Sequence, residues 1–107
     1  MKLILAIVSD EDAGKVSGEL SKNNFSVTKL ATTGGFLKAG NTTVLIGTED
    51  EKVQQVIDII ESKSKRRKQI TVSGMHIQEQ AAGAYPIEVE VGGATIFVLN
   101  IDRFEKV

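Results

Sequence analysis

The run Leu3-Ile4-Leu5-Ala6-Ile7-Val8 is continuously apolar and is followed at once by Ser9-Asp10-Glu11-Asp12. Such a short run bounded by polar residues is typical of a central strand covered on both faces, and it is too short for a helix. A membrane span would need roughly 20 apolar residues. A signal peptide would need a small-residue cleavage site, and none follows this run. We therefore expect a buried strand here.

Alternating helix and strand patterns continue from this strand. Ser9 begins a Ser-x-x-Asp sequence close to a capping box, and apolar residues recur at helical spacing as far as Lys22. Thr48 begins a second capping pattern and another amphipathic helix, which ends in the basic run 63–68. The other predicted elements are strands at 25–33, 42–47, 69–73, 87–91 and 94–99, the last two joined as a hairpin by Gly92-Gly93.

This order of elements predicts an α+β, ferredoxin-like βαββαβ fold with an additional C-terminal hairpin, in a single domain that spans residues 1–107. Two helices would cover one face of the sheet. The other face would then expose a large apolar patch, so we expect a homo-oligomer whose sheets pack together.

The composition excludes several functional classes. The chain has 13 Lys and Arg against 14 Asp and Glu, so its net charge of −1 does not indicate binding to nucleic acid or to an acidic membrane. It has no Cys, which excludes disulfides and thiolate metal sites and favours a reducing cytoplasm. The basic run 63–68 lacks interleaved aromatic residues, so a solvated helix end is favoured over an RNA site.

Catalytic chemistry is poorly supported. Residues 35–42 read Gly-x-x-x-x-Gly-Asn-Thr, but Asn41 stands where a phosphate-binding P-loop has its Lys, and a strand follows instead of a helix. His76 is alone in an irregular segment, Glu88 and Glu90 share one strand face, and the acids 10–12 fit a helix start better than a metal site. We expect no enzyme, no catalytic residue and no metal.

Ligand binding is better supported, by the loop 32–42. Its glycines allow backbone N–H groups to approach a phosphate closely, Phe36 offers a flat face to a purine, and Asn41 can donate to and accept from an adenine edge. Stacking on an aromatic ring contributes about 1–3 kcal/mol per base. Alternatively, Phe36 and Leu37 fill a pocket of a neighbouring subunit, and the residues alone favour neither interpretation.

Two segments carry a family resemblance. Residues 28–43 (TKLATTGGFLKAGNTT) and 86–95 (PIEVEVGGAT) closely resemble the PII-like cyclic di-AMP receptor family of Gram-positive bacteria, PstA or DarA, and the similarity covers essentially the whole chain. It implies a cytoplasmic homotrimer of ferredoxin-like subunits that binds cyclic di-AMP, with no other cofactor, in clefts between neighbours. Loop rearrangement would relay the signal to a partner protein.

The resemblance also implies roles for single residues. Phe36 and Leu37 would pack against an adenine, and Asn41 would hydrogen-bond around the ligand. The further ligand contacts that it implies are Asn24, Thr28, Gly35, Gly47, Gly92 and Phe97.

Two departures from the family pattern support a second hypothesis. Ser26 stands where the family commonly has Arg, and the segment Ser73 to Ala84 lacks the usual Pro-Met-Gly-Gly and Pro-Tyr-Pro sequences. The alternative is a PII-like sensor of ATP, another adenine nucleotide or a small metabolite, in which cyclic di-AMP binding is weakened or lost.

Overall fold

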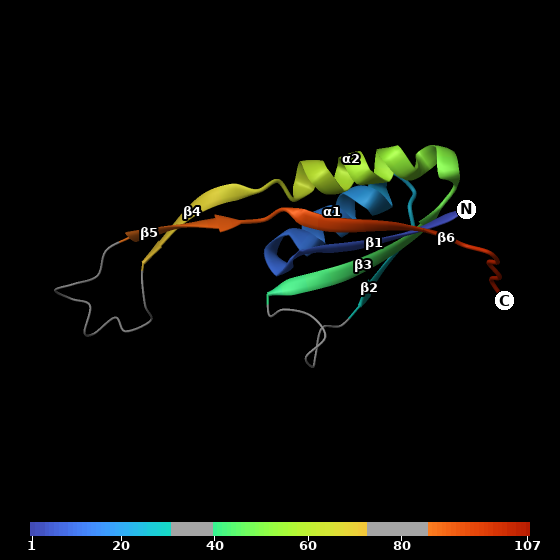
Figure 1. Ribbon diagram of the computed structural model, residues 1–107, viewed down its shortest axis with the longest axis horizontal. Coiled ribbons are helices and arrows are strands. Elements are labelled where there is room, and N and C mark those ends of the chain that lie inside the picture. The colour runs from blue at the N-terminus through green and yellow to red at the C-terminus, as the bar shows by residue number, and fades with distance from the viewer. Residues whose placement is uncertain (31–39, 73–85) are drawn as a thin grey trace.

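The computed structural model describes residues 1–30, 40–72 and 86–107 (Figure 1). Its main sheet has four strands in the order β2-β3-β1-β6, and all neighbours are antiparallel. The strands are β1 (Lys2–Ser9), β2 (Val27–Leu30), β3 (Asn41–Thr48) and β6 (Ala94–Asn100). With β6 as the fourth strand, this is the order of a ferredoxin-like sheet, so the predicted α+β class is confirmed.

Both helices lie on the same face of this sheet (Figure 1). They are α1 (Asp10–Lys22) and α2 (Val53–Lys63), the latter preceded by a 3-10 turn, η1 (Asp50–Lys52). Alternate residues of the strands and one stripe of each helix meet between these layers. The core that results consists of Ile4, Ala6, Val8, Ala13, Val16, Leu20, Phe25, Val44, Ile46, Val56 and Ile60.

Neither helical segment begins with the side-chain cap that the sequence predicts. Ser9 occupies the N-cap position of α1, but its hydroxyl donates to the Asp12 carboxylate at 3.1 Å and caps no backbone N–H. Thr48 is the last residue of β3, and the N-cap position of the second helical segment falls to Glu49. Asp12 also accepts hydrogen bonds from Arg67, which are described below.

A second sheet extends away from the first (Figure 1). It consists of β4 (Arg67–Val72) and β5 (Pro86–Val91), paired antiparallel from Arg67 and Val91 onward. We call this pair the arm. β4 begins inside the basic run, so part of the segment that was expected to be a solvated helix end is strand.

The predicted hairpin across Gly92-Gly93 is wrong. Both glycines have positive φ, 87° and 84°, as a tight turn would need, but β5 pairs with β4 and β6 pairs with β1. The two glycines instead connect strands that follow one another end to end (Figure 1). The left-handed conformation is accessible to glycine in either situation, so the dipeptide alone does not distinguish a turn from a bend.

The sheet face opposite the helices carries apolar side chains that no described element of this chain covers, and we call it the open face. It includes Leu3, Leu5, Ile7, Leu45, Phe97 and Leu99, as the strand register and burial pattern require. The exposed fractions of Phe97 and Leu99 are 52% and 45%. The expectation that β1 is covered on both faces is thus not met by the described part of one chain.

Candidate functional site

A row of side chains crosses the open face of the main sheet. The strand register aligns Thr28 of β2 with Leu45, Leu45 with Leu5, and Leu5 with Phe97 of β6. Neighbouring strands lie about 4.8 Å apart, so Thr28 and Phe97 stand at opposite ends of the row, about 14 Å from each other. These two predicted ligand residues share a face of the sheet but do not form one pocket within a chain.

Gly47 and Asn24 lie near the β2 end of this face. Gly47 of β3 pairs with Leu3 of β1. Among the described residues, no atom lies within 4 Å of the place that a Cβ on Gly47 would occupy. The backbone there is open to close approach by a ligand. Asn24 follows α1, is exposed, and has a φ of 69°, a left-handed conformation that Asn tolerates better than most residues.

Asn41 and Gly92 lie together, away from that row. They line a cavity of about 500 Å³ between the main sheet and the base of the arm. Its other lining residues are Ser9, Asp10, Glu11, Gly40, Gln69, Glu90 and Val91. The backbone N–H of Asp10 donates to the carbonyl of Gly40 at 2.8 Å, which fixes the start of β3 against the start of α1 and so positions Asn41.

A smaller cavity of about 200 Å³ adjoins the same two residues, Asn41 and Gly92, on the side of β6. Arg66 lines it, whereas the larger cavity is lined by three carboxylates, those of Asp10, Glu11 and Glu90. Arg67 and Arg66 pair with two of these carboxylates, Glu11 and Glu90, at 3.1 and 3.7 Å, and so offset part of the negative charge. Carboxylates thus lie on one side of Asn41 and Gly92, and the Arg66 guanidinium lies on the other.

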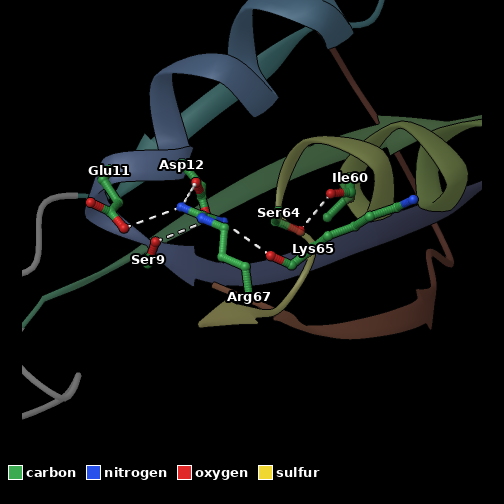
Figure 2. Close-up of polar contacts among 7 residues, drawn as sticks. All are labelled: Ser9, Glu11, Asp12, Ile60, Ser64, Lys65 and Arg67. Atoms are coloured by element: carbon green, nitrogen blue, oxygen red, sulfur yellow. Dashed lines mark hydrogen bonds and ion pairs between the residues drawn. The ribbon is translucent and has the colours of Figure 1, made fainter. Parts of the chain in front are cut away.

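An ion-pair cluster joins the base of the arm to the start of α1 (Figure 2). The Arg67 guanidinium donates to Asp12 at 2.9 and 3.2 Å, and to Glu11 at 3.1 Å. Asp12 is fully buried and also accepts from the Ser9 hydroxyl. Nearby, the buried Ser64 donates its hydroxyl to the carbonyl of Ile60 at 2.5 Å, at the end of α2.

The cluster keeps Asp12 ionised. Burial alone would raise the pKa of its carboxyl, but the hydrogen bonds from Arg67 and Ser9 and the positive charges of Arg67 and Lys15 outweigh burial. The pKa of Asp12 therefore lies below its ordinary value of 3.8. The hydrogen bond to Asp12 in turn raises the pKa of Arg67.

Sequence reasoning missed Arg67, Gln69 and the carboxylates around Asn41. Arg67 was assigned to a solvated basic run, and its partner Asp12 lies 55 positions earlier in the chain. The β-branched segment after the basic run did predict a strand from Gln69, but the strand begins two residues earlier, at Arg67. Three predicted contacts, Gly35, Phe36 and Leu37, and the segment Ser73 to Ala84 lie outside the described residues.

Within the described ranges, no group of three or more His, Cys, Asp or Glu is arranged to hold a metal ion. None of the helices in those ranges is long and apolar enough to cross a membrane.

Comparison with known proteins identifies the family. The family model described as "Cyclic-di-AMP receptor" matches residues 1–107. The chain belongs to the cyclic-di-AMP receptor family. The resemblance carried by residues 28–43 and 86–95 is thereby confirmed, and the family is one of receptors, whose ligand is cyclic di-AMP.

A solved structure supports the fold of this receptor. The chain is similar to a functionally unknown protein from Pediococcus pentosaceus ATCC 25745, with which it shares 44% sequence identity. The crystal structure of that protein matches the present fold with a TM-score of 0.78. The match covers 99% of this chain and 96% of that one.

Proposed function

We propose that this receptor is a non-enzymatic, cytoplasmic signal-transduction protein that binds cyclic di-AMP between the subunits of a homotrimer. Residues 1–107 would act as one PII-like domain. The separation of Thr28 and Phe97 is the observation that carries this proposal. The family resemblance implies that both contact the ligand, yet they stand at opposite edges of one sheet.

A ligand between two chains would resolve that separation. The β2 edge of one subunit would supply Asn24, Thr28 and Gly47, and the β6 edge of its neighbour would supply Phe97. The open face favours such an assembly, because burying apolar surface contributes about 25 cal/mol per Å². A large uncovered apolar face usually marks an interaction site.

The loop 31–39 would complete the site. Phe36 and Leu37 would pack on an adenine, the backbone of Gly35 would allow close approach, and Asn41 would hydrogen-bond to the ligand from the first position of β3. Binding would then rearrange this loop and the segment Ser73 to Ala84, and so relay the signal to a partner protein.

Several features support binding without turnover. Asn41 stands in place of a P-loop Lys and begins a strand, β3, where a P-loop leads into a helix. In the described part of the chain, Glu88 and Glu90 are exposed and pair with Lys68 and Arg66 at 3.5 and 3.7 Å, which suits a solvated strand face. Neither of these two carboxylates is thereby set up as a general base.

Ser26 favours a second candidate function. It is exposed directly before β2, where an Arg would add a planar donor for a base or a phosphate. Without that donor, the same fold would serve as a sensor of ATP, another adenine nucleotide or a small metabolite.

Competition binding separates the two functions. A fluorescent cyclic di-AMP analogue is bound to the full chain and titrated with unlabelled cyclic di-AMP, ATP or AMP. We expect cyclic di-AMP to displace the analogue, and ATP and AMP to leave it bound. Preferential displacement by a mononucleotide would favour the second function over the first.

A further inference from the structure

The arm is attached to the rest of the chain only at its base, among the described residues. β4 and β5 pair mainly with each other, and they project beyond the main sheet (Figure 1). The long axis of the molecule measures 60 Å against 28 and 20 Å for the other two. Whatever sets the direction of the arm must therefore act near residues 64–67 and 91–93.

Arg67 makes charged contacts between that base and α1. As the first residue of β4, it binds two carboxylates at the start of α1, Asp12 and Glu11, and donates to the carbonyl of Lys65 at 3.0 Å (Figure 2). Hydrogen bonds between charged groups are stronger and more directional than neutral ones. One side chain thus joins α1, the linker that follows α2, and the arm.

Gly92 leaves the space that this arrangement needs. A Cβ at position 92 would lie 2.5 Å from the Lys65 carbonyl oxygen and 2.6 Å from Nη1 of Arg67. Its φ of 87° is also a conformation that glycine adopts readily and other residues adopt at a cost. The next residue, Gly93, donates its N–H to the carbonyl of Ser64, which holds the end of β5 beside the end of α2.

We propose that Arg67 is a positioning residue: its guanidinium, held by Asp12 and Glu11 and seated against Gly92, sets the direction of the arm relative to the main sheet. Gln69, Glu90, Val91 and Gly92 of the arm base form one wall of the 500 Å³ cavity, and Asn41 belongs to the other. Arg67 therefore controls the width of that cavity without lining it. Arg67 would position the arm in the ligand-free chain, so this role does not depend on which nucleotide binds.

A distance measurement between the arm and α2 tests this role. The chain contains no Cys, so Gln55→Cys on α2 and Ile70→Cys on β4 can carry two spin labels, both at exposed positions. Labelled chains are mixed with excess unlabelled full-length protein, so that only distances within one chain are recorded. The reference is the doubly labelled chain without any further substitution, and we expect one narrow distance distribution for it.

Arg67→Ala should broaden that distribution or shift its maximum. Lys68→Ala is the matched control, because Lys68 is the next cation on β4 and its partner Glu88 lies within the arm. We expect Lys68→Ala to leave the distribution as in the reference. Gly92→Ala should shift it as well, since the new methyl group would displace Arg67 or the Lys65 carbonyl.

Removing Arg67 alone leaves Asp12 buried and unpaired, which can prevent folding. The double variant Asp12→Asn/Arg67→Ala removes both charges and keeps the measurement possible. A broadened or shifted distribution in this variant supports the proposal. An unchanged distribution in a folded Arg67 variant, or a reference distribution as broad as that of the variant, would overturn it.

Discussion

Asp12 and Arg67 come from distant parts of the chain, and their contact connects the start of α1 to the arm. The carboxylate of Asp12 is buried, and its negative charge is retained because Arg67 and Ser9 both donate to it. A surface ion pair would contribute little to stability. This pair is different, because one partner has no access to water and two donors compensate it.

Asp12→Asn should lower stability near neutral pH by about 1.5–3 kcal/mol, the contribution of a hydrogen bond to a charged group. Because the folded-state pKa of Asp12 is lowered, its contribution is fully present above pH 3.8 and is lost as the pH falls through the lower folded-state value. The stability difference between wild type and variant should therefore shrink in acid. Thermal unfolding from pH 7 down to pH 3 measures it.

Asp58→Asn is the matched control for that measurement, because Asp58 is an exposed carboxylate on α2 and accepts, among the described residues, a hydrogen bond from Gln54. We expect a much smaller effect at neutral pH. A constant difference between wild type and Asp12→Asn across the whole pH range would contradict the assigned ion pair.

Ser26 is exposed directly before β2, beside the proposed ligand. Ser26→Arg should tighten cyclic di-AMP binding roughly ten- to a hundredfold, since a hydrogen bond to a charged group contributes about 1.5–3 kcal/mol and each 1.4 kcal/mol is a factor of ten. Calorimetric titration of both proteins measures the ratio. Ser62→Arg, which adds the same charge on α2, should leave affinity unchanged, and equal gains from both variants would indicate a nonspecific charge effect.

At the scale of elements, the arm differs from the main sheet in what it packs against. β1 and β3 contribute buried residues to the core, whereas Ile70 of β4 has an exposed fraction of 71%. Local opening is easiest where few apolar contacts hold a segment. The arm should therefore open more readily than the strands of the main sheet.

Hydrogen exchange followed by mass spectrometry checks this expectation in the ligand-free protein. Amides of β4 and β5 should exchange faster than those of β1 and β3, and Arg67→Ala should accelerate exchange at the arm base further. Equal protection of the arm and β1 would show that another surface covers the arm.

Several of the helices and strands could be predicted from the sequence alone, and the pairing of others could not. The apolar run 3–8, the two amphipathic helices and the β-branched segment 42–47 identify β1, α1, β3 and α2, because hydrophobic periodicity is local information. The pairing of β5 with β4 and not with β6 depends on contacts between distant residues. Gly92-Gly93 is equally compatible with a turn and with a bend, so the hairpin prediction failed there.

The same difference between local patterns and contacts of distant residues applies to the proposed site. The motif around residues 28–43 was enough to indicate the family and its ligand, because it is long and specific. It did not show that Thr28 and Phe97 stand at opposite edges of the sheet, which is a consequence of strand order. Nor did local patterns reveal the contact between Asp12 and Arg67, since they cannot pair residues so far apart.

At the scale of the whole molecule, the open face is an apolar surface that no described element of the chain covers. Leu3, Leu5, Leu45 and Leu99 present apolar surface beside Phe97. Burying one such side chain contributes about 1.5–3 kcal/mol, and each copy in an assembly would bury several. A trimer whose sheets face one another would bury the open face.

Leu99→Glu should dissociate that trimer, because it places a charge on the open face at the β6 edge. Light scattering coupled to size exclusion should give three times the chain mass for the wild type and a smaller mass for the variant. Gln55→Glu, on the exposed side of α2, should remain trimeric. A monomeric wild type would contradict the proposed assembly.

Calorimetric titration of the wild-type protein with cyclic di-AMP measures directly whether the chain binds this nucleotide. We expect saturable binding with about one ligand per chain, since each interface of a closed trimer offers one site, and a much weaker response to ATP under the same conditions. No detectable binding of cyclic di-AMP at high micromolar concentrations would contradict this expectation.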